Sequence, residues 1–282
     1  MSGTCTDTVS AARNHPSANG ARDRHIIRNR VAFLEQKIPG YASILGIVGI
    51  LVLWEVVCRL ELVTSSSLPA PTAILTTGWD MLISGELHQN LLTSLYRILI
   101  GYAIGAGAGI VVGLALGFSR WADAIFSPVV YSIYPIPKIA LLPLVVLWLG
   151  IGETPKFTLI ALGVFFPVVI NTFSGVKNVD PIWIKAAVTF GSSHLRVIRK
   201  VILPGALPMI FAGLKLAAGT SLLLLVAAEM IAAQQGLGSM ILHYGNLMIT
   251  TKLMVGVLIL SLLGLLFNRG LQWLERKLLP WK

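Results

Sequence analysis

Long apolar runs separated by shorter polar segments make up most of this sequence. A helix needs about 20 mainly apolar residues to cross a bilayer. Because lipid cannot satisfy the unpaired backbone groups of an open strand, each such run predicts a helix. Six runs meet or approach the required length: 42–61, 93–118, 127–149, 157–175, 207–232 and 253–270. The pattern therefore predicts an all-α, polytopic membrane protein with about six transmembrane helices.

The distribution of charge supports this prediction and orients it. Hydrophobic residues make up 55% of the chain and charged residues only 12%, about half the charged fraction of a soluble domain. With a cytoplasmic N-terminus, the cytoplasmic segments hold 16 Lys or Arg and the outer segments only Lys156 and Lys252. This asymmetry follows the positive-inside rule. It predicts cytoplasmic N- and C-termini, and it places the net charge of +10 at a membrane surface rather than on nucleic acid.

The N-terminal segment, residues 1–40, is polar and basic and lacks the apolar core of a cleavable signal peptide. We interpret it as a disordered cytoplasmic tail; the alternative is a short amphipathic helix at 26–37 on the lipid headgroups. The two cysteines, Cys5 and Cys58, are too few and too differently placed to predict a disulfide framework or a metal site.

Glycines recur every four residues in the second apolar run. A helical stripe without side chains lets another helix approach closely, which is a common packing device in lipid. We expect close packing within the chain, with a gliding or subunit interface as the alternative. The stripe consists of Gly101, Gly105, Gly109, Gly113 and Gly117.

The third run contains four prolines, and its YPIPK segment at 134–138 predicts a broken helix. Proline removes a backbone donor, so a break at membrane depth is tolerated where protein or a water-filled cavity supplies partners. Such a helix often lines a pathway, although a kink that merely fits the fold explains it equally well. Pro135, Pro137 and Lys138 are therefore pathway candidates, and Lys138 is a cation that an anionic solute could meet.

Other charged residues also fall within or beside predicted spans, where a charge is costly unless it is paired, hydrated or able to reach the interface. They are Glu55, Arg97, Lys215 and Glu229. For Arg97 and Lys215 we expect snorkelling to the membrane surface. Glu229, near the outer end of the fifth run, is either an outer-leaflet carboxylate bonded to backbone or a further pathway candidate.

A polar insertion between the fourth and fifth runs predicts a helical hairpin. Asp180 is a suitable N-cap and Pro181 suits the first helical position, while Gly191 can take the left-handed conformation that ends a helix. Ser192 or Ser193 should cap a second helix, which we expect to end by Pro204. An amphipathic wheel gives this helix an apolar side and a basic side. The apolar side is Leu195, Val197, Ile198, Val201 and Ile202; the basic side is Arg196, Arg199 and Lys200.

The hairpin resembles the EAA loop of ABC importer permeases, in the pattern Lys185-Ala186-Ala187, Gly191, and Val201-Ile202-Leu203-Pro204. It departs from that pattern at Lys185, where the family has glutamate. The resemblance extends over roughly residues 45–282 and is closest to the nitrate, sulfonate, taurine and bicarbonate branch. Sulfonate members of that branch often carry proline at the position of Lys138. Supporting runs are SLPAPTAIL (67–75), YPIPKIALLPLVVLWLGIGE (134–153), LPGALPMIFAGLKLA (203–217) and AAEMIAAQQGLGSMI (227–241).

The resemblance implies a type I ABC importer permease fold, with a permease domain at 41–282 and a coupling loop at 177–205. It implies a homodimer of permease chains in a bacterial inner membrane, two ATPase subunits on the cytoplasmic side and an extracytoplasmic solute-binding protein. The solute would be a small anion such as a sulfonate, taurine or nitrate. The residues that would couple to the ATPase are Lys185, Ala186, Ala187, Gly191, Val201, Leu203 and Pro204.

The sequence contains no GxxxxGK[ST] phosphate loop, so we expect no cofactor on this chain and ATP-Mg on the partner ATPase. An ion-coupled secondary transporter is the main alternative, because a broken span and buried charges suit one too. A membrane hydrolase using Ser239 and His243 is less favoured, since no acidic orienting residue or oxyanion loop accompanies them.

Overall fold

The computed structural model describes residues 40–64 and 67–281, and every regular element in these residues is helical. Apart from Gly40, the predicted basic tail at 1–40 and the alternative helix at 26–37 lie outside the described residues. The chain divides into two units between Leu53 and Trp54. The first unit contains the beginning of α2 (Gly40–Arg59), and the second contains all the later helices.

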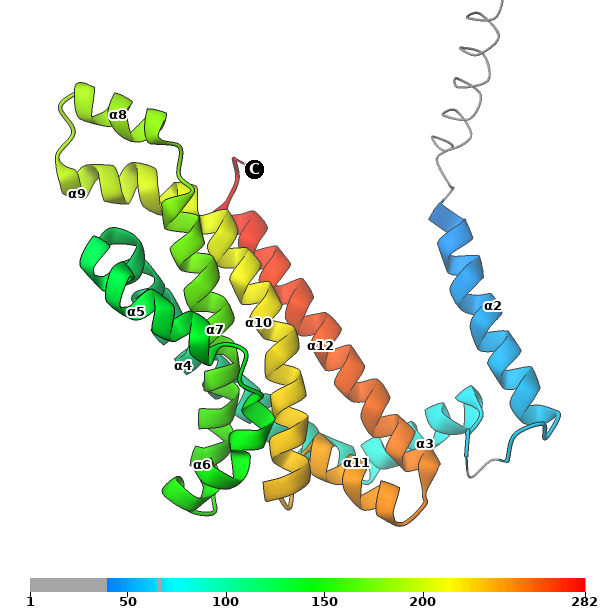
Figure 1. The fold of residues 1–282 in the computed structure, drawn as a ribbon. Helices are drawn as coiled ribbons and strands as arrows, with labels where there is room; N and C mark the ends of the chain where they lie inside the picture. The colour runs from blue at the N-terminus through cyan, green and yellow to red at the C-terminus, as the bar shows by residue number, and fades with distance from the viewer. Residues whose placement is uncertain (1–39, 65–66, 282) are drawn as a thin grey trace, which may run out of the picture. The chain divides into compact units, whose positions relative to one another are not determined.

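The second unit is a helical bundle with short helices at both of its ends (Figure 1). Its helices are α3 (Pro71–Ile83), α4 (Glu86–Phe118), α5 (Arg120–Ile133), α6 (Leu142–Leu149), α7 (Thr154–Lys177), α8 (Pro181–Thr189), α9 (His194–Val197), α10 (Leu203–Ala232), α11 (Leu237–Asn246) and α12 (Thr250–Leu278). A 3₁₀ turn at Lys138–Leu141 precedes α6, and a π-helical turn at Ile198–Ile202 joins α9 to α10.

Among the described residues, four helical stretches are long and apolar enough to cross a membrane: Glu86–Phe118, Thr154–Lys177, His194–Ala232 and Thr250–Leu278. The helices on either side of the break at 134–137 form a fifth if they count as one span, bent by 88°. These stretches match five of the six predicted runs, and the first run, 42–61, coincides with α2. The all-α membrane fold is therefore confirmed.

The segments predicted as outer loops differ from expectation, because they hold α3 and α11. Pro71 occupies a first-turn position of α3, where its missing N–H costs nothing. Both helices bury apolar residues in one cluster with α12 and α4. The cluster contains Ile74, Met81, Leu87, Leu237, Met240, Tyr244 and Val255. Burial of this shared apolar face stabilises both segments as helices.

The glycine stripe of α4 faces α7, which confirms close packing within the chain. A Cβ added to Gly101 would lie 2.7 Å from the Ile160 Cβ, and one added to Gly117 would lie 2.7 Å from the Val176 Cβ. These contacts lie well inside van der Waals distance, so alanine at these positions would push the two helices apart. Glycine therefore sets the spacing of α4 and α7 along their length.

α10 packs against α7 in the same manner and completes the centre of the bundle. A Cβ on Gly213 of α10 would lie 2.6 Å from the Asn171 Cβ of α7. Fully buried side chains from all three helices meet there, including Ile98, Ile160 and Leu225. This close-packed core positions two features, the hairpin between α7 and α10 and the cavity beside the broken span.

Candidate functional site

The hairpin at 181–202 begins and turns as its sequence predicts. The Asp180 carboxylate accepts a hydrogen bond from the Ile182 N–H at 2.8 Å, and Pro181 follows as the first residue of α8. Gly191 has a φ of +75°, and its N–H donates to the Val188 carbonyl at 2.9 Å. These contacts cap both ends of α8. A left-handed φ favours glycine at position 191, because a Cβ is strained there.

The hairpin projects from the bundle where α7 ends and α10 begins (Figure 1). It exposes several large apolar side chains. Phe190 is 88% exposed at the tip of the hairpin, and Lys185 and Ala186 are also exposed. Exposed aromatic and aliphatic groups gathered in a short segment mark an interaction surface. The exposed apolar side chains are Ile182, Trp183, Val188, Phe190 and Leu195.

The predicted end of the second hairpin helix at Pro204 is wrong. The chain continues helically from His194 to Ala232. The Leu203 N–H bonds to the Ile198 carbonyl in a π-helical turn, and Pro204, which has no N–H to donate, follows at once within the continuing helix. The remaining residues of the pattern, Val201 and Leu203, are half-buried at this junction. The second half of the hairpin is therefore continuous with α10.

The predicted apolar side of that helix is also partly wrong. Val197 is buried and Ile198, Val201 and Ile202 are half-buried, but Leu195 is 58% exposed. The π-helical turn widens the helix after Val197 and changes which residues share a face. The predicted basic side is confirmed, since all of its cations are exposed: Arg196, Arg199 and Lys200.

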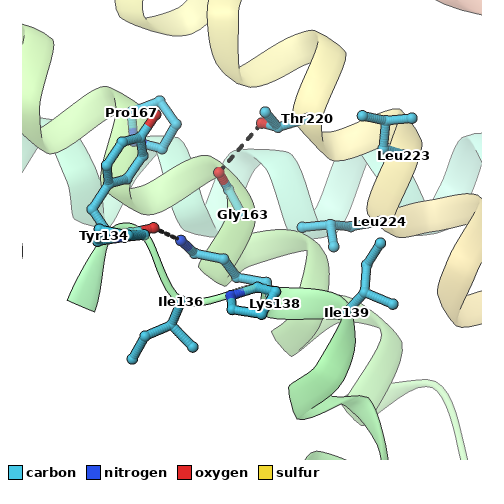
Figure 2. A pocket seen from close by; sticks show the side chains of 11 residues that line it. Tyr134, Ile136, Lys138, Ile139, Gly163, Pro167, Thr220, Leu223 and Leu224 are labelled. Atoms are coloured by element: carbon cyan, nitrogen blue, oxygen red, sulfur yellow. Dashed lines mark hydrogen bonds between the residues drawn. The ribbon is translucent and has the colours of Figure 1, made fainter.

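The break in the third predicted span is confirmed, and a cavity lies beside it. α5 ends at Ile133, and the chain resumes as a 3₁₀ turn at Lys138. The cavity measures about 400 Å³, within the range of small-molecule sites. Its walls come from the broken segment, α7 and α10 (Figure 2). The lining residues are Tyr134, Pro135, Ile136, Pro137, Lys138, Ile139, Gly163, Pro167, Thr220, Leu223 and Leu224.

Lys138 is the one charged residue among the described residues that line this cavity. Its Nζ donates a hydrogen bond to the Tyr134 carbonyl (Figure 2). The same nitrogen lies 4.9 Å from the centroid of the Tyr134 ring and 5.0 Å from that of Phe166. Ring faces attract a cation, so the lysine head is held at the break. Within residues 40–64 and 67–281, no carboxylate pairs with it.

Glu229 lies away from this cavity, in a buried polar network at the opposite end of the bundle from the hairpin. It is fully buried, at 0% exposure, and accepts hydrogen bonds from the Gly238 N–H at 2.8 Å and the Ser94 hydroxyl at 2.8 Å. Arg97 Nη1 completes its shell at 2.9 Å. The expected bond to backbone is present, and the side-chain partners are additional. In this arrangement Glu229 ties α10 to α4 and to the start of α11.

The snorkelling expected of the buried Arg97 is wrong, whereas that of the partly exposed Lys215 stays a prediction. Arg97 is only 3% exposed, and it donates two parallel hydrogen bonds to Glu153, at 2.6 and 2.7 Å. Lys215 pairs with Glu275 of α12 at 2.7 Å. Both cations thus find carboxylates inside the chain, which for Arg97 removes the need to reach the membrane surface. Sequence spacing gave no signal for these partners, because they lie far away along the chain.

Glu153 lies in the short loop between α6 and α7 and is 44% exposed. Its hydrogen bonds to Arg97 lower its pKa from 4.5 to about 2, and a further bond from Lys156 at 2.9 Å acts in the same direction. The carboxylate therefore remains ionised at neutral pH. This ion-pair network holds the loop after α6, and hence the second half of the broken span, against α4 and α10.

A bundle of membrane-spanning helices, with a cavity at a broken span and a projecting apolar hairpin, is the architecture of a transport subunit. Residues 105–280 match the family of binding-protein-dependent transport system inner membrane components, and the chain belongs to this family. It is a multi-pass permease subunit of an ABC importer, and such subunits work with ATPase and binding-protein partners. The resemblance seen in the sequence is confirmed, and the ion-coupled alternative is not favoured.

Along most of its length the chain is similar to named transport permeases from bacteria. An aliphatic sulfonates transport permease protein of Bacillus subtilis (strain 168) is 38% identical over 233 residues, which cover 83% of this chain and 84% of the relative. The taurine transport system permease protein of Escherichia coli (strain K12) is 38% identical over 237 residues, which cover 82% of this chain and 86% of that relative.

Solved transporters share the fold at lower sequence identity. The MetNI methionine ABC transporter, in inward facing conformations, gives a TM-score of 0.56 at 22% identity, covering 66% of this chain and 92% of the matched chain. An amino acid ABC transporter with histidines gives a TM-score of 0.55 at 19% identity, covering 72% of this chain and 96% of the matched chain. These matches agree with the type I importer permease fold expected from the sequence.

Proposed function

We propose that this chain is the translocation subunit for small organic sulfonates and that the hairpin at 181–202 couples it to the ATPase. Two copies of the chain would form the pathway in a bacterial inner membrane, with ATP-Mg bound to two separate ATPase subunits. A solute-binding protein would deliver the sulfonate from outside. The solute class is inferred from the names of the two relatives at 38% identity.

The exposed apolar surface of the hairpin carries the coupling proposal. Burying one large apolar side chain contributes about 1.5–3 kcal/mol. Phe190 is 88% exposed, so nearly all of this free energy would stabilise a complex in which a partner covers it. Ala186, whose side chain is small, lets a partner approach the helix closely. Motion of a docked ATPase would then pass along the continuous helix from His194 into α10. The coupling loop, residues 177–205, acts in this proposal as a lever on the permease domain, residues 41–282.

Lys185 sets the charge of the proposed docking surface. It is exposed on α8, and it stands where the family pattern has glutamate. A cation there favours an acidic groove on the ATPase, whereas the family residue would favour a basic one. Lys185→Glu should therefore weaken assembly with this chain's own ATPase. Co-purification of the ATPase with tagged permease measures this, and undiminished recovery would contradict the assigned contact.

The coupling proposal is tested at Gly191, with two substitutions that differ in backbone tolerance. Asparagine accepts a positive φ far better than valine does, so Gly191→Asn should keep the hairpin angle and Gly191→Val should change it. Both variants would be reconstituted in proteoliposomes with the ATPase and the binding protein. We expect Gly191→Val to retain ATP hydrolysis and lose uptake, with Gly191→Asn close to wild type. Normal uptake by Gly191→Val would overturn the coupling role.

The solute class has its own test. Proteoliposomes containing the wild-type complex should accumulate ³⁵S-labelled butanesulfonate in the presence of ATP and the binding protein. Failure to accumulate butanesulfonate, ethanesulfonate or taurine would refute the proposed solute. Native mass measurement of the same complex tests the stoichiometry, for which we expect two copies of this chain and two ATPase subunits.

The proposed orientation places the hairpin and both termini in the cytoplasm. The C-terminal end of α12 lies at the same end of the bundle as the hairpin (Figure 1). Both regions carry exposed cations, including Arg199 and Lys277, in keeping with the positive-inside rule. Phe190→Cys, in a chain lacking Cys5 and Cys58, should react with a membrane-impermeant maleimide only in inverted vesicles. Labelling in intact cells would contradict this orientation.

A further inference from the structure

The cavity at the broken span combines one cation with apolar walls, and its composition suits a particular kind of solute. Lys138 supplies the positive charge, while leucine, isoleucine and proline side chains form most of the remaining lining (Figure 2). Its volume of about 400 Å³ is ample for a short organic molecule. A solute that matches this lining has one anionic end and an apolar body.

The ammonium group of Lys138 has donors available for such an anion. An ammonium has three N–H donors, and one of them is used by the Tyr134 carbonyl. The rings of Tyr134 and Phe166 attract the cation through their faces and use none of its donors. Two N–H groups therefore remain to bind sulfonate oxygens. Since no carboxylate among the described residues pairs with Lys138, an incoming anion would not have to displace an internal partner.

We propose that this cavity is a solute subsite that binds alkanesulfonates, with the sulfonate on Lys138 and the alkyl chain against the apolar wall. The inference rests on the proposed function for its solute class and goes beyond it by assigning the residues and the preferred chain type. Because sulfonate members of the branch often carry proline at the position of Lys138, this contact would be particular to this chain and not a requirement of sulfonate transport in general. Leu223, Leu224 and Ile139 belong to this apolar wall. Each methylene added to the solute should strengthen binding by burying more apolar surface against this wall, until the cavity is filled.

The same lining discriminates against a zwitterion such as taurine. Taurine's ammonium group would enter a cavity whose charged group is already a cation. Among the described lining residues there is no carboxylate to receive it. One candidate acceptor, the Gly163 carbonyl, lies 3.3 Å from the Thr220 hydroxyl and keeps a lone pair for at most one further donor. An ammonium has three donors, and leaving most of them unpaired in a buried site is costly, so the subsite should bind butanesulfonate at least about tenfold more tightly than taurine.

The experiment measures binding to the permease itself, so that the specificity of the binding protein does not enter. The wild-type permease–ATPase complex, in lipid nanodiscs and without binding protein, would be titrated with butanesulfonate and with taurine. Saturation-transfer NMR detects weak ligands through their own proton signals. We expect saturable butanesulfonate binding and at least about tenfold weaker taurine binding.

Three variants identify the source of the binding. Lys138→Met keeps the length and removes the charge, and it should weaken butanesulfonate binding about tenfold or more; Lys138→Arg keeps the charge and should stay within a few-fold of wild type. Lys252→Met removes a lysine outside the cavity lining and should leave binding unchanged. Basal ATP hydrolysis shows that each complex is assembled and folded.

The outcomes separate this inference from the proposed function. Equal butanesulfonate binding by wild type and Lys138→Met overturns the subsite. Equal losses in Lys138→Met and Lys138→Arg also overturn it, because charge would then not be the determinant. If wild-type proteoliposomes accumulate sulfonates but the complex binds none at this cavity, the subsite is wrong and the transport function stands. If no sulfonate accumulates at all, the proposed solute is wrong.

Discussion

Replacing Gly105 by alanine tests whether the glycine stripe sets the spacing of α4 and α7. The added Cβ would overlap the Ala161 carbonyl oxygen and lie 2.9 Å from the Val164 Cβ, whereas ordinary van der Waals contact begins at 3.4 Å. Two of the atoms within reach belong to the α7 backbone, which no rotamer change can move aside. The helices must therefore separate, and overpacking of this kind costs about 1–3 kcal/mol.

Gly107→Ala is the matched control, because Gly107 lies on the same helix with nothing within 4 Å of its added Cβ. Alanine is favoured over glycine in a helix by about 1 kcal/mol, and this gain is shared by the two variants. The difference between them therefore isolates the contact with α7. We expect Gly105→Ala to be the less stable by about 1–3 kcal/mol.

Thermal unfolding of the purified variants in detergent, followed by tryptophan fluorescence, measures this difference. For a chain of this size, each kcal/mol corresponds to a shift in Tm of about 2–4 °C. Gly105→Ala should therefore unfold below Gly107→Ala by several degrees. Equal Tm values for the two variants would show that α7 moves away from α4 without loss of stability. That result would refute the argument that glycine sets the spacing of α4 and α7.

Three further predictions concern the polar contacts. Arg97→Met leaves the fully buried Glu229 without its cation and should destabilise the chain by about 3–5 kcal/mol in the same unfolding assay; a loss below 1 kcal/mol would contradict the network. The pKa of Glu153 lies near 2 in the folded chain, against an ordinary value of 4.5, so its stabilising contribution is complete above pH 4.5 and declines as pH falls towards 2. Glu153→Gln should abolish this decline in stability between pH 4.5 and 2. An unchanged dependence of stability on pH in the variant would contradict the role of Glu153. Tyr102→Phe removes the bond from its hydroxyl to the Leu214 carbonyl, 2.7 Å long, and should cost about 1 kcal/mol, measured as a lower Tm.

The local features of the hairpin could be predicted because each depends on neighbours in the sequence. The Asp180 cap bonds a residue two positions away, and the turn at Gly191 uses carbonyls within five residues. The break after Ile133 follows from prolines that cannot donate hydrogen bonds. Even here the prediction failed at Pro204, because the π-helical turn upstream uses the Ile198 carbonyl and lets the helix continue.

The sequence by itself determined the helical membrane class, the glycine stripe and the caps of the hairpin, because periodicity and capping act over a few residues. The tertiary structure alone decided which partners the buried charges find. Arg97 looked like a snorkelling residue because its carboxylates, Glu153 and Glu229, lie 56 and 132 positions away in the chain. The tertiary structure also decided that the glycine stripe faces α7 and that Lys138 shares a cavity with Thr220. Contacts between distant segments depend on how whole helices pack, and a local pattern carries no record of that packing.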